Sequence, residues 1–144
     1  MIVSDTTPLN YLILIEAVEI LPTLYRDVLI PRAVQDELSH TAAPDVVRAW
    51  IAKPPGGLAV EVVEPEALAS VSGLDPGERE AILLAKQHAE GLLLIDERDG
   101  VAVALRQGLR IVGTLGVLDA AASRGLIDLR TVFERLDKTS FRSP

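Results

Sequence analysis

The chain has 144 residues, 49% of them hydrophobic, which is enough to bury a continuous core, and we expect one domain over residues 1–144. It contains no cysteine, so disulfides, thiolate metal sites and a cysteine nucleophile are excluded, and a reducing cytoplasm is its expected location. The net charge of −7 argues against a protein that coats nucleic acid non-specifically, because that affinity comes from cations that neutralise phosphates.

The charge is unevenly distributed along the chain. Residues 1–97 carry a net charge of −10, and residues 98–144 carry a net charge of +3. A local basic surface and arginines scattered over solvated helix faces both fit this asymmetry, and we prefer the second interpretation.

A histidine-based zinc site and a membrane segment are not expected. His40 and His88 are isolated and lack any metal-ligand spacing. The N-terminus has no basic segment, and Glu16 and Glu19 interrupt its most apolar stretch, so we expect neither a signal peptide nor a membrane span.

The hydrophobic patterns predict strands that alternate with helices. In the first half we expect a strand over residues 2–5, an apolar helix over 9–21, a strand over 28–30, helices over 31–39 and 44–52, and a strand over 58–63. In the second half we expect a helix over 75–89, a strand over 92–95, a helix over 99–107, a strand over 109–112 and a helix over 116–124.

This alternation, with strands that are apolar on both faces, predicts an α/β fold. Such strands form a parallel sheet that helices cover on both sides, which gives a three-layer α/β/α sandwich. Ligands bind such sheets in the crevice beyond the carboxyl ends of the strands. Two of the predicted strands end there in an aspartate, Asp5 and Asp96.

Each of these aspartates also has a purely structural explanation, because aspartate favours turns and helix starts. Glu37 is harder to explain in that way. In the helix over residues 31–39 it lies near the apolar stripe of Val34 and Leu38, whereas Asp36 points almost opposite. A glutamate at the edge of a buried face needs a basic partner, a capping role or a metal.

Glu78 has two competing explanations. It lies three residues after Asp75, at the N3 position of a capping box, which is a local stabilising device. It also shares a helix face with Ile82 and Ala85, whereas Glu80 points the other way. This orientation favours an inward-facing carboxylate.

Asp5, Glu37, Glu78 and Asp96 are therefore predicted to converge at one end of the sheet. Crowded carboxylates repel one another, so they take up protons unless a cation neutralises them. A hard divalent ion such as Mg²⁺ or Mn²⁺ suits an all-oxygen site. With such metals bound, the site can activate a water molecule for attack on phosphorus.

Several segments together resemble the PIN-domain nucleases over nearly the whole chain. The segments are residues 3–9 (VSDTTPL), 31–38 (PRAVQDEL), 77–85 (GEREAILLA) and 93–97 (LLIDE). Residues 111–118 (IVGTLGVL) and 125–127 (GLI) look like the uncharacterised branch related to VapC-type toxins. The resemblance implies an α/β/α fold with a central parallel sheet and cleavage of single-stranded RNA with carboxylate-bound Mg²⁺ or Mn²⁺.

The resemblance also implies roles for individual residues. Asp5 matches the first acid of the family pattern, Glu37 the second, Glu78 the third and Asp96 the fourth, as catalytic and metal-binding residues. Thr6 matches a hydroxyl residue that accompanies the first acid, and Thr114 is a further candidate. The third acid is a glutamate where many toxins have aspartate, and Glu97 or Asp99 could contribute at the fourth position.

The favoured prediction is an endoribonuclease that is the toxin of a toxin–antitoxin pair. Its expected partners are the RNA substrate, a small antitoxin protein and a second copy of the chain in a homodimer. One alternative is a catalytically weak or inactive PIN-like module that binds RNA or protein. Another is a phosphoryl-transfer domain with Asp5 as nucleophile, which ranks well below because a companion aspartate two residues later and a nearby lysine are missing.

Overall fold

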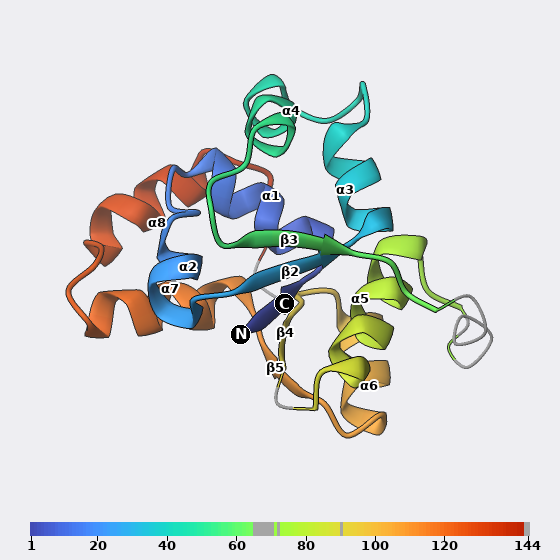
Figure 1. The fold of residues 1–144 in the computed structure, drawn as a ribbon. Coiled ribbons are helices and arrows are strands. Elements are labelled where there is room, and N and C mark those ends of the chain that lie inside the picture. Colours follow the sequence, from blue (N-terminus) through green and yellow to red (C-terminus); the bar gives the residue numbers. More distant parts are fainter. Residues whose placement is uncertain (65–70, 72, 90, 143–144) are drawn as a thin grey trace.

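The structure, a computed structural model, describes residues 1–64, 71, 73–89 and 91–142 (Figure 1). The strands of this part of the chain are Ile2–Ser4 (β1), Val28–Pro31 (β2), Leu58–Glu61 (β3), Leu92–Leu94 (β4) and Arg110–Val112 (β5). The helices are Thr6–Leu14 (α1), Ile20–Tyr25 (α2), Arg32–Ser39 (α3), Asp45–Ala52 (α4), Pro76–Gln87 (α5), Arg98–Arg106 (α6), Thr114–Ser123 (α7) and Leu129–Asp137 (α8).

The five strands form one sheet in which every pair is parallel, in the order β3-β2-β1-β4-β5. The first strand lies at the centre, where Ile2 is in register with Val28 of β2 on one side and with Leu92 of β4 on the other. All three residues of β1 are buried, as expected for a strand that helices cover on both faces. The predicted α/β/α fold with a central parallel sheet is confirmed.

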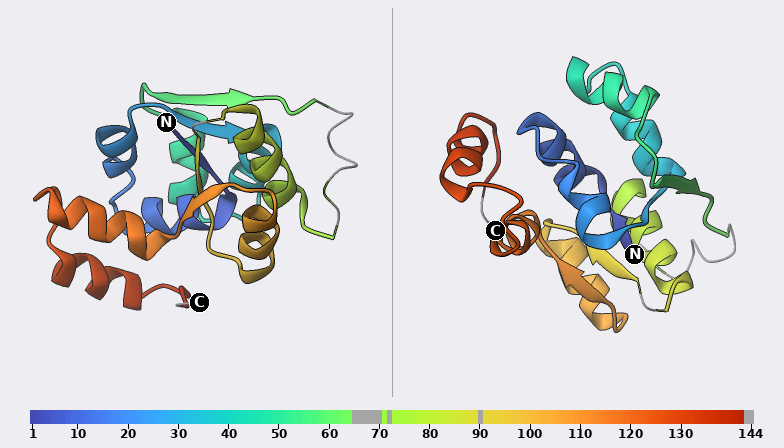
Figure 2. Two further views of the ribbon diagram at one scale, coloured as in Figure 1. Left: turned by 90° about the horizontal axis from the view of Figure 1, so that it is seen from below. Right: turned by 60° about the vertical axis from the view of Figure 1, so that its left-hand side comes forward.

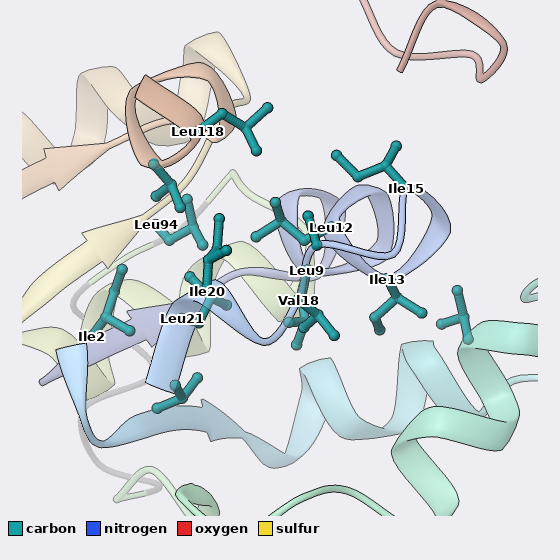
Figure 3. Packing of buried hydrophobic residues seen from close by; sticks show 14 of the residues in the cluster. Ile2, Leu9, Leu12, Ile13, Ile15, Val18, Ile20, Leu21, Leu94 and Leu118 are labelled. Atoms are coloured by element: carbon teal, nitrogen blue, oxygen red, sulfur yellow. The ribbon is translucent and has the colours of Figure 1, made fainter. Parts of the chain in front are cut away.

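The two faces of the sheet carry separate apolar clusters. On one face, Ile2, Ile30 and Leu94 pack with side chains of α1, α2, α4, α7 and α8. Figure 3 shows the close packing of Leu9 and Leu12 from α1 in this cluster. On the other face, Val3, Leu29 and Leu93 pack against α5 and α6. The period-two alternation along the strands thus divides the core into two halves.

The predicted helix over residues 9–21 is wrong, because the chain breaks between α1 and α2. Glu16 has a φ of 60°, and its N–H donates to Ile13 O (3.0 Å), while Ala17 N–H donates to Leu12 O (2.9 Å). This is the hydrogen-bond pattern of a Schellman motif, in which glycine is the usual residue at positive φ. Glu16 stands there instead, so the sequence carries no stop signal.

Two helices of the structure, α2 and α8, were not predicted. The second of them is amphipathic, with Val132 and Leu136 buried four residues apart, and it packs on α7 at the outside of its layer (Figure 2). Both are short helices whose stability comes from tertiary packing. Within the described residues, no helix has the length and apolar character that crossing a bilayer requires.

The positive φ of Glu16 leads to a stability prediction. Replacing Glu16 by glycine removes the strain of a left-handed L-residue, so Glu16→Gly should raise the free energy of unfolding by about 1 kcal/mol. The lost contact with Arg135 is worth little, because its closest N···O distance is 3.8 Å and Glu16 is 78% exposed. Urea denaturation measures the change.

The matched control is Glu134→Gly, at an exposed position inside α8. There glycine meets ordinary helical geometry and should lower the free energy of unfolding by about 1 kcal/mol. An equal decrease in the free energy of unfolding in both variants would contradict the strained conformation at Glu16.

Candidate functional site

The first and fourth strands meet at the point where the strand order reverses. From β1 the chain continues to β2 and β3 on one side of the sheet, whereas β4 and β5 lie on the other side. Asp5 follows β1 directly, and its backbone N–H donates to Leu94 O at the end of β4 (2.9 Å). Asp96 comes two residues after β4. Both aspartates therefore lie at the crevice where open α/β sheets bind ligands.

Asp5 is buried, with only 2% of its surface exposed. It occupies the N-cap position of α1, but its side chain makes no capping hydrogen bond, so capping does not explain it. The pKa of Asp5 is raised to about 7, mainly by burial and also by the charges of Asp75, Glu37 and Asp96, against the lowering effect of the Thr6 N–H. The structure thus brings three more acids close enough to act on Asp5.

Glu78 is the second buried acid of this cluster. It is 7% exposed, and its Oε2 atom is buried without a hydrogen-bond partner. Burial raises the pKa of Glu78 to about 8, with further contributions from its hydrogen bond to Asp75 and from the charges of Asp75, Asp5 and Glu97. In this acid, too, burial disfavours the charged form.

Only one half of the predicted capping box is present at the start of α5. Asp75 Oδ1 accepts a hydrogen bond from the Glu78 N–H (2.8 Å), so Asp75 caps the helix. The Glu78 side chain contributes to the acidic cluster. The capping explanation therefore holds for Asp75 but not for the Glu78 carboxylate.

Two glycines allow helices to approach the acids closely. A Cβ atom at Gly77 would lie 2.6 Å from Glu37 Oε1 and 3.0 Å from Thr6 Oγ1, and one at Gly100 would lie 2.5 Å from Glu78 Oε2. The hydroxyl oxygen of Thr6 is buried and, like Glu78 Oε2, has no hydrogen-bond partner. Glu37 and Thr6 therefore lie at the first turn of α5, next to Glu78.

Asp96 is held differently, because both of its oxygens are engaged by Thr114. Its Oδ1 accepts from the Thr114 N–H (2.8 Å), and its Oδ2 accepts from the Thr114 hydroxyl (2.5 Å). Asp96 thus caps the N-terminus of α7 from a distance of 18 residues along the chain. A carboxylate has about four lone-pair sites, so Asp96 keeps acceptor capacity for a further partner.

Two members of the acidic cluster were missed as site candidates or left open. The sequence predicts only a capping role for Asp75, yet its charge acts on both Asp5 and Glu78. Glu97, the exposed N-cap residue of α6, raises the pKa of Glu78. The available signal for Asp75 was its position, since a residue that caps the first turn of α5 must lie near Glu78.

The remaining acids considered from the sequence lie outside the buried cluster, although Asp36 lines the groove beside Glu37. Asp36 and Asp99 are exposed on α3 and in the first turn of α6. Glu80 Oε1 accepts a hydrogen bond from the Ala33 N–H in the first turn of α3 (3.2 Å), where a negative charge is favourable. Its role is to connect α5 to α3.

The chemistry of the cluster fits a hard divalent cation. Its donors are all oxygens, two of its acids have a raised pKa, and Glu78 Oε2 and Thr6 Oγ1 are buried without partners. Within residues 1–64, 71, 73–89 and 91–142, no three acidic or histidine side chains are already arranged to hold one metal ion. Binding would therefore need side-chain rotation or ligation through water, which Mg²⁺ commonly retains.

The acidic cluster borders on two open grooves. Thr6 and Glu37 line the first, together with Asn10 and His40. Asp96 and Glu97 line the second, which extends to the C-terminal segment at residues 140–142. An extended ligand could therefore approach the acids from either side of α1.

The buried acids predict an unusual pH dependence of stability in the metal-free protein. Between about pH 4 and pH 7 the folded chain holds a proton at Asp5 that an unfolded aspartate, with a pKa of 3.8, has released. The free energy of unfolding should therefore fall as pH rises through this window. Asp5→Asn should be more stable than the wild type at pH 8, by on the order of a few kcal/mol, with the difference shrinking toward pH 4.

Denaturation in EDTA at pH 5 and pH 8 measures this effect. The matched control is Asp119→Asn, at an exposed position on α7, which should leave the pH dependence unchanged. An Asp5→Asn variant that is less stable than the wild type at pH 8 would contradict the prediction that the buried, charged carboxylate lowers the free energy of unfolding.

The model of the family DUF3368, described as a PIN domain, matches residues 1–144. Searches among curated proteins and among solved structures gave no match. The all-parallel sheet and its covering helices are consistent with a PIN-like α/β/α sandwich. The chain belongs to the PIN-domain family, whose members are generally nucleases.

Proposed function

We propose that this protein is a Mg²⁺- or Mn²⁺-dependent endoribonuclease that hydrolyses phosphodiester bonds in single-stranded RNA. The observation that carries the proposal is the pair of buried carboxyls, Asp5 and Glu78, at the topological switch point of the sheet. Their pKa values of about 7 and about 8 show how far burial disfavours their charged forms. Such groups in a crevice are typical of functional sites. Burying them destabilises the fold, so a function is the expected reason for their position.

We assign Asp5, Glu37, Glu78 and Asp96 to the metal site, with Asp75 as an additional acid beside it. A divalent cation bound there supplies the positive charge that neutralises the carboxylates and polarises a phosphodiester toward attack by water. Glu78 Oε2 is free of other partners and can serve as a ligand without breaking a hydrogen bond. Thr6 Oγ1 likewise has no hydrogen-bond partner and can serve as a ligand without breaking a hydrogen bond.

The chain's own residues hold this arrangement in place. Asp5 is fixed by the backbone hydrogen bond from its N–H to Leu94 O. Asp96, through Thr114, fixes the start of α7 relative to β4. In the metal-free protein Asp5 and Glu78 hold protons near neutral pH, and these protons must leave when a cation binds. Cation affinity is therefore expected to rise with pH.

RNA as the substrate, the VapC-like branch, the toxin role, the antitoxin partner and the homodimer come from the sequence resemblance and stay predictions. The two grooves that border on the acids support an extended, single-stranded substrate. The alternative function is a PIN-like module that binds RNA without cutting it. The grooves would serve that function too, but the buried acids would be a cost without a benefit.

Substitution of Asp5 tests the proposed function. Asp5→Asn keeps the shape of the side chain but removes the charge, so cleavage of single-stranded RNA in Mg²⁺ or Mn²⁺ should fall on the order of 100-fold or more. Mn²⁺ binding, measured by calorimetry or electron paramagnetic resonance, should weaken in parallel. Asp119→Asn should behave as the wild type in both measurements.

Three outcomes decide between the functions. Cleavage by the wild type that continues in EDTA would contradict metal dependence. Cleavage by Asp5→Asn at the wild-type rate would remove Asp5 from the site. RNA binding without cleavage by either protein would instead favour the binding module.

Gly77 provides a second test that leaves every acid in place. Gly77→Ala would bring a Cβ atom to 2.6 Å from Glu37 Oε1, so the Glu37 carboxylate must move. We expect cleavage to fall about 10-fold or more, since small displacements of ligands and their supports are costly in metal sites. Stability should change little, because the displaced atom ends a flexible side chain and alanine suits the first turn of a helix.

The matched control is Gly56→Ala, at a position where an added Cβ atom would meet nothing within 4 Å. Its cleavage rate should equal that of the wild type. A Gly77→Ala enzyme with unchanged cleavage would show that Glu37 is not needed where the structure places it.

A further inference from the structure

The groove beside Asp96 and Glu97 combines aromatic rings, hydroxyls and guanidinium groups. Its walls come from Thr7 and Tyr11 on α1, from Arg98 at the start of α6, and from Ser140, Phe141 and Arg142 in the C-terminal segment. These elements are far apart in the sequence. The groove therefore exists only because the C-terminal segment returns to α1.

Two contacts fix the C-terminal segment on α1. The Tyr11 hydroxyl and Ser140 Oγ are within hydrogen-bond distance (2.9 Å), and the rings of Tyr11 and Phe141 lie with their centroids 5.2 Å apart and tilted by 45°. Both rings are partly buried against the core cluster, so they are held in place but not enclosed. They offer a preorganised aromatic surface at the edge of the acidic cluster.

Two exposed arginines border the same groove. The Arg98 side chain makes no hydrogen bond or ion pair with any other described residue, and Arg142 Nη1 donates to Phe141 O (3.0 Å). In a chain with a net charge of −7, such cations beside the acids give a polyanion a favourable approach. The groove on the other side of α1 has no such pair, because Asp36, Glu37 and His40 are the titratable residues among the described side chains that line it.

We propose that this groove binds a nucleotide of the single-stranded substrate next to the cleaved bond. The base stacks on the ring of Phe141, which packs against Tyr11, and the adjoining phosphate is neutralised by Arg98 and Arg142. The hydroxyls of Thr7 and Ser140 lie in the same groove and are suited to contacts with the sugar or phosphate. This inference rests on the proposed nuclease function and adds the side from which the strand enters the site.

Stacking and phosphate contacts predict a particular kind of recognition. Every base has a flat face, so stacking on the aromatic pair tolerates any base sequence. Bases paired inside a duplex are not available for it, so double-stranded RNA should compete poorly for the groove. The chemistry therefore selects single strands over duplexes and does not select a sequence.

The test is binding of a fluorescently labelled single-stranded RNA to the full chain in EDTA, measured by anisotropy at several salt concentrations. Without divalent cations the readout is independent of cleavage. Phe141→Leu keeps an apolar side chain but removes the flat ring, and it should raise the Kd about 5-fold or more without changing the salt dependence. Arg142→Ala and Arg98→Ala should each raise the Kd and reduce the slope of log K against log salt by about one.

The matched controls lie on α8. Phe133→Leu and Arg130→Ala remove the same chemical groups from exposed positions outside the groove, and both should bind RNA as the wild type does. Thermal denaturation of each variant separates loss of binding from loss of fold. If Phe141→Leu is unstable, the exposed Arg98 and Arg142 still test the groove, because neither belongs to the core.

The outcomes separate this inference from the proposed function. Groove variants that bind like the wild type, while Asp5→Asn abolishes cleavage, would overturn the groove and leave the nuclease intact. Binding that depends on Phe141 and Arg142, in a protein without divalent-dependent cleavage, would support the groove and overturn the nuclease. Equal losses of RNA affinity in the groove variants and in the α8 controls would show non-specific attraction and overturn the proposed nucleotide-binding groove.

Discussion

The parallel pairing of β1 between β2 and β4 is the constraint on which the rest of the structure depends. A central strand that is buried on both faces requires helices on both sides, and parallel neighbours require each connection to cross from one end of the sheet to the other. All carboxyl ends therefore point the same way. Asp5 must emerge there, next to the end of β4, because its N–H continues the hydrogen bonding to Leu94.

This position has an electrostatic cost that the fold has to offset. Two carboxyls are buried at the reversal of strand order, where burial and neighbouring acids raise their pKa values. The apolar clusters on the two faces of the sheet supply the stability that makes this cost tolerable. Gly77 and Gly100 contribute in another way, because the space without a Cβ atom is where carboxylate oxygens of Glu37 and Glu78 lie.

The acids of the cluster differ in how the fold uses them. Asp96 is tied to the α7 N-terminus through Thr114, whereas Glu78 Oε2 makes no hydrogen bond at all. The acids thus have two roles. An acid whose oxygens accept hydrogen bonds fixes a helix, and an acid with an unpaired oxygen is available to a ligand. The C-terminal segment adds one cation, Arg142, next to this set, although it comes from the other end of the chain.

The sequence by itself determined the alternation of strands and helices, the parallel sheet and the two aspartates at strand ends, because apolar periodicity and position after a strand are local properties. Helical geometry, read from the sequence, also predicted the inward orientation of Glu78. Only the tertiary structure decided the break at Glu16. There the burial of the neighbouring residues imposes a left-handed conformation, and the sequence has no glycine at that position to indicate it. It alone brought Asp75 to Asp5 and Phe141 to Tyr11, since contacts between distant segments depend on how whole elements pack and not on the residues beside them.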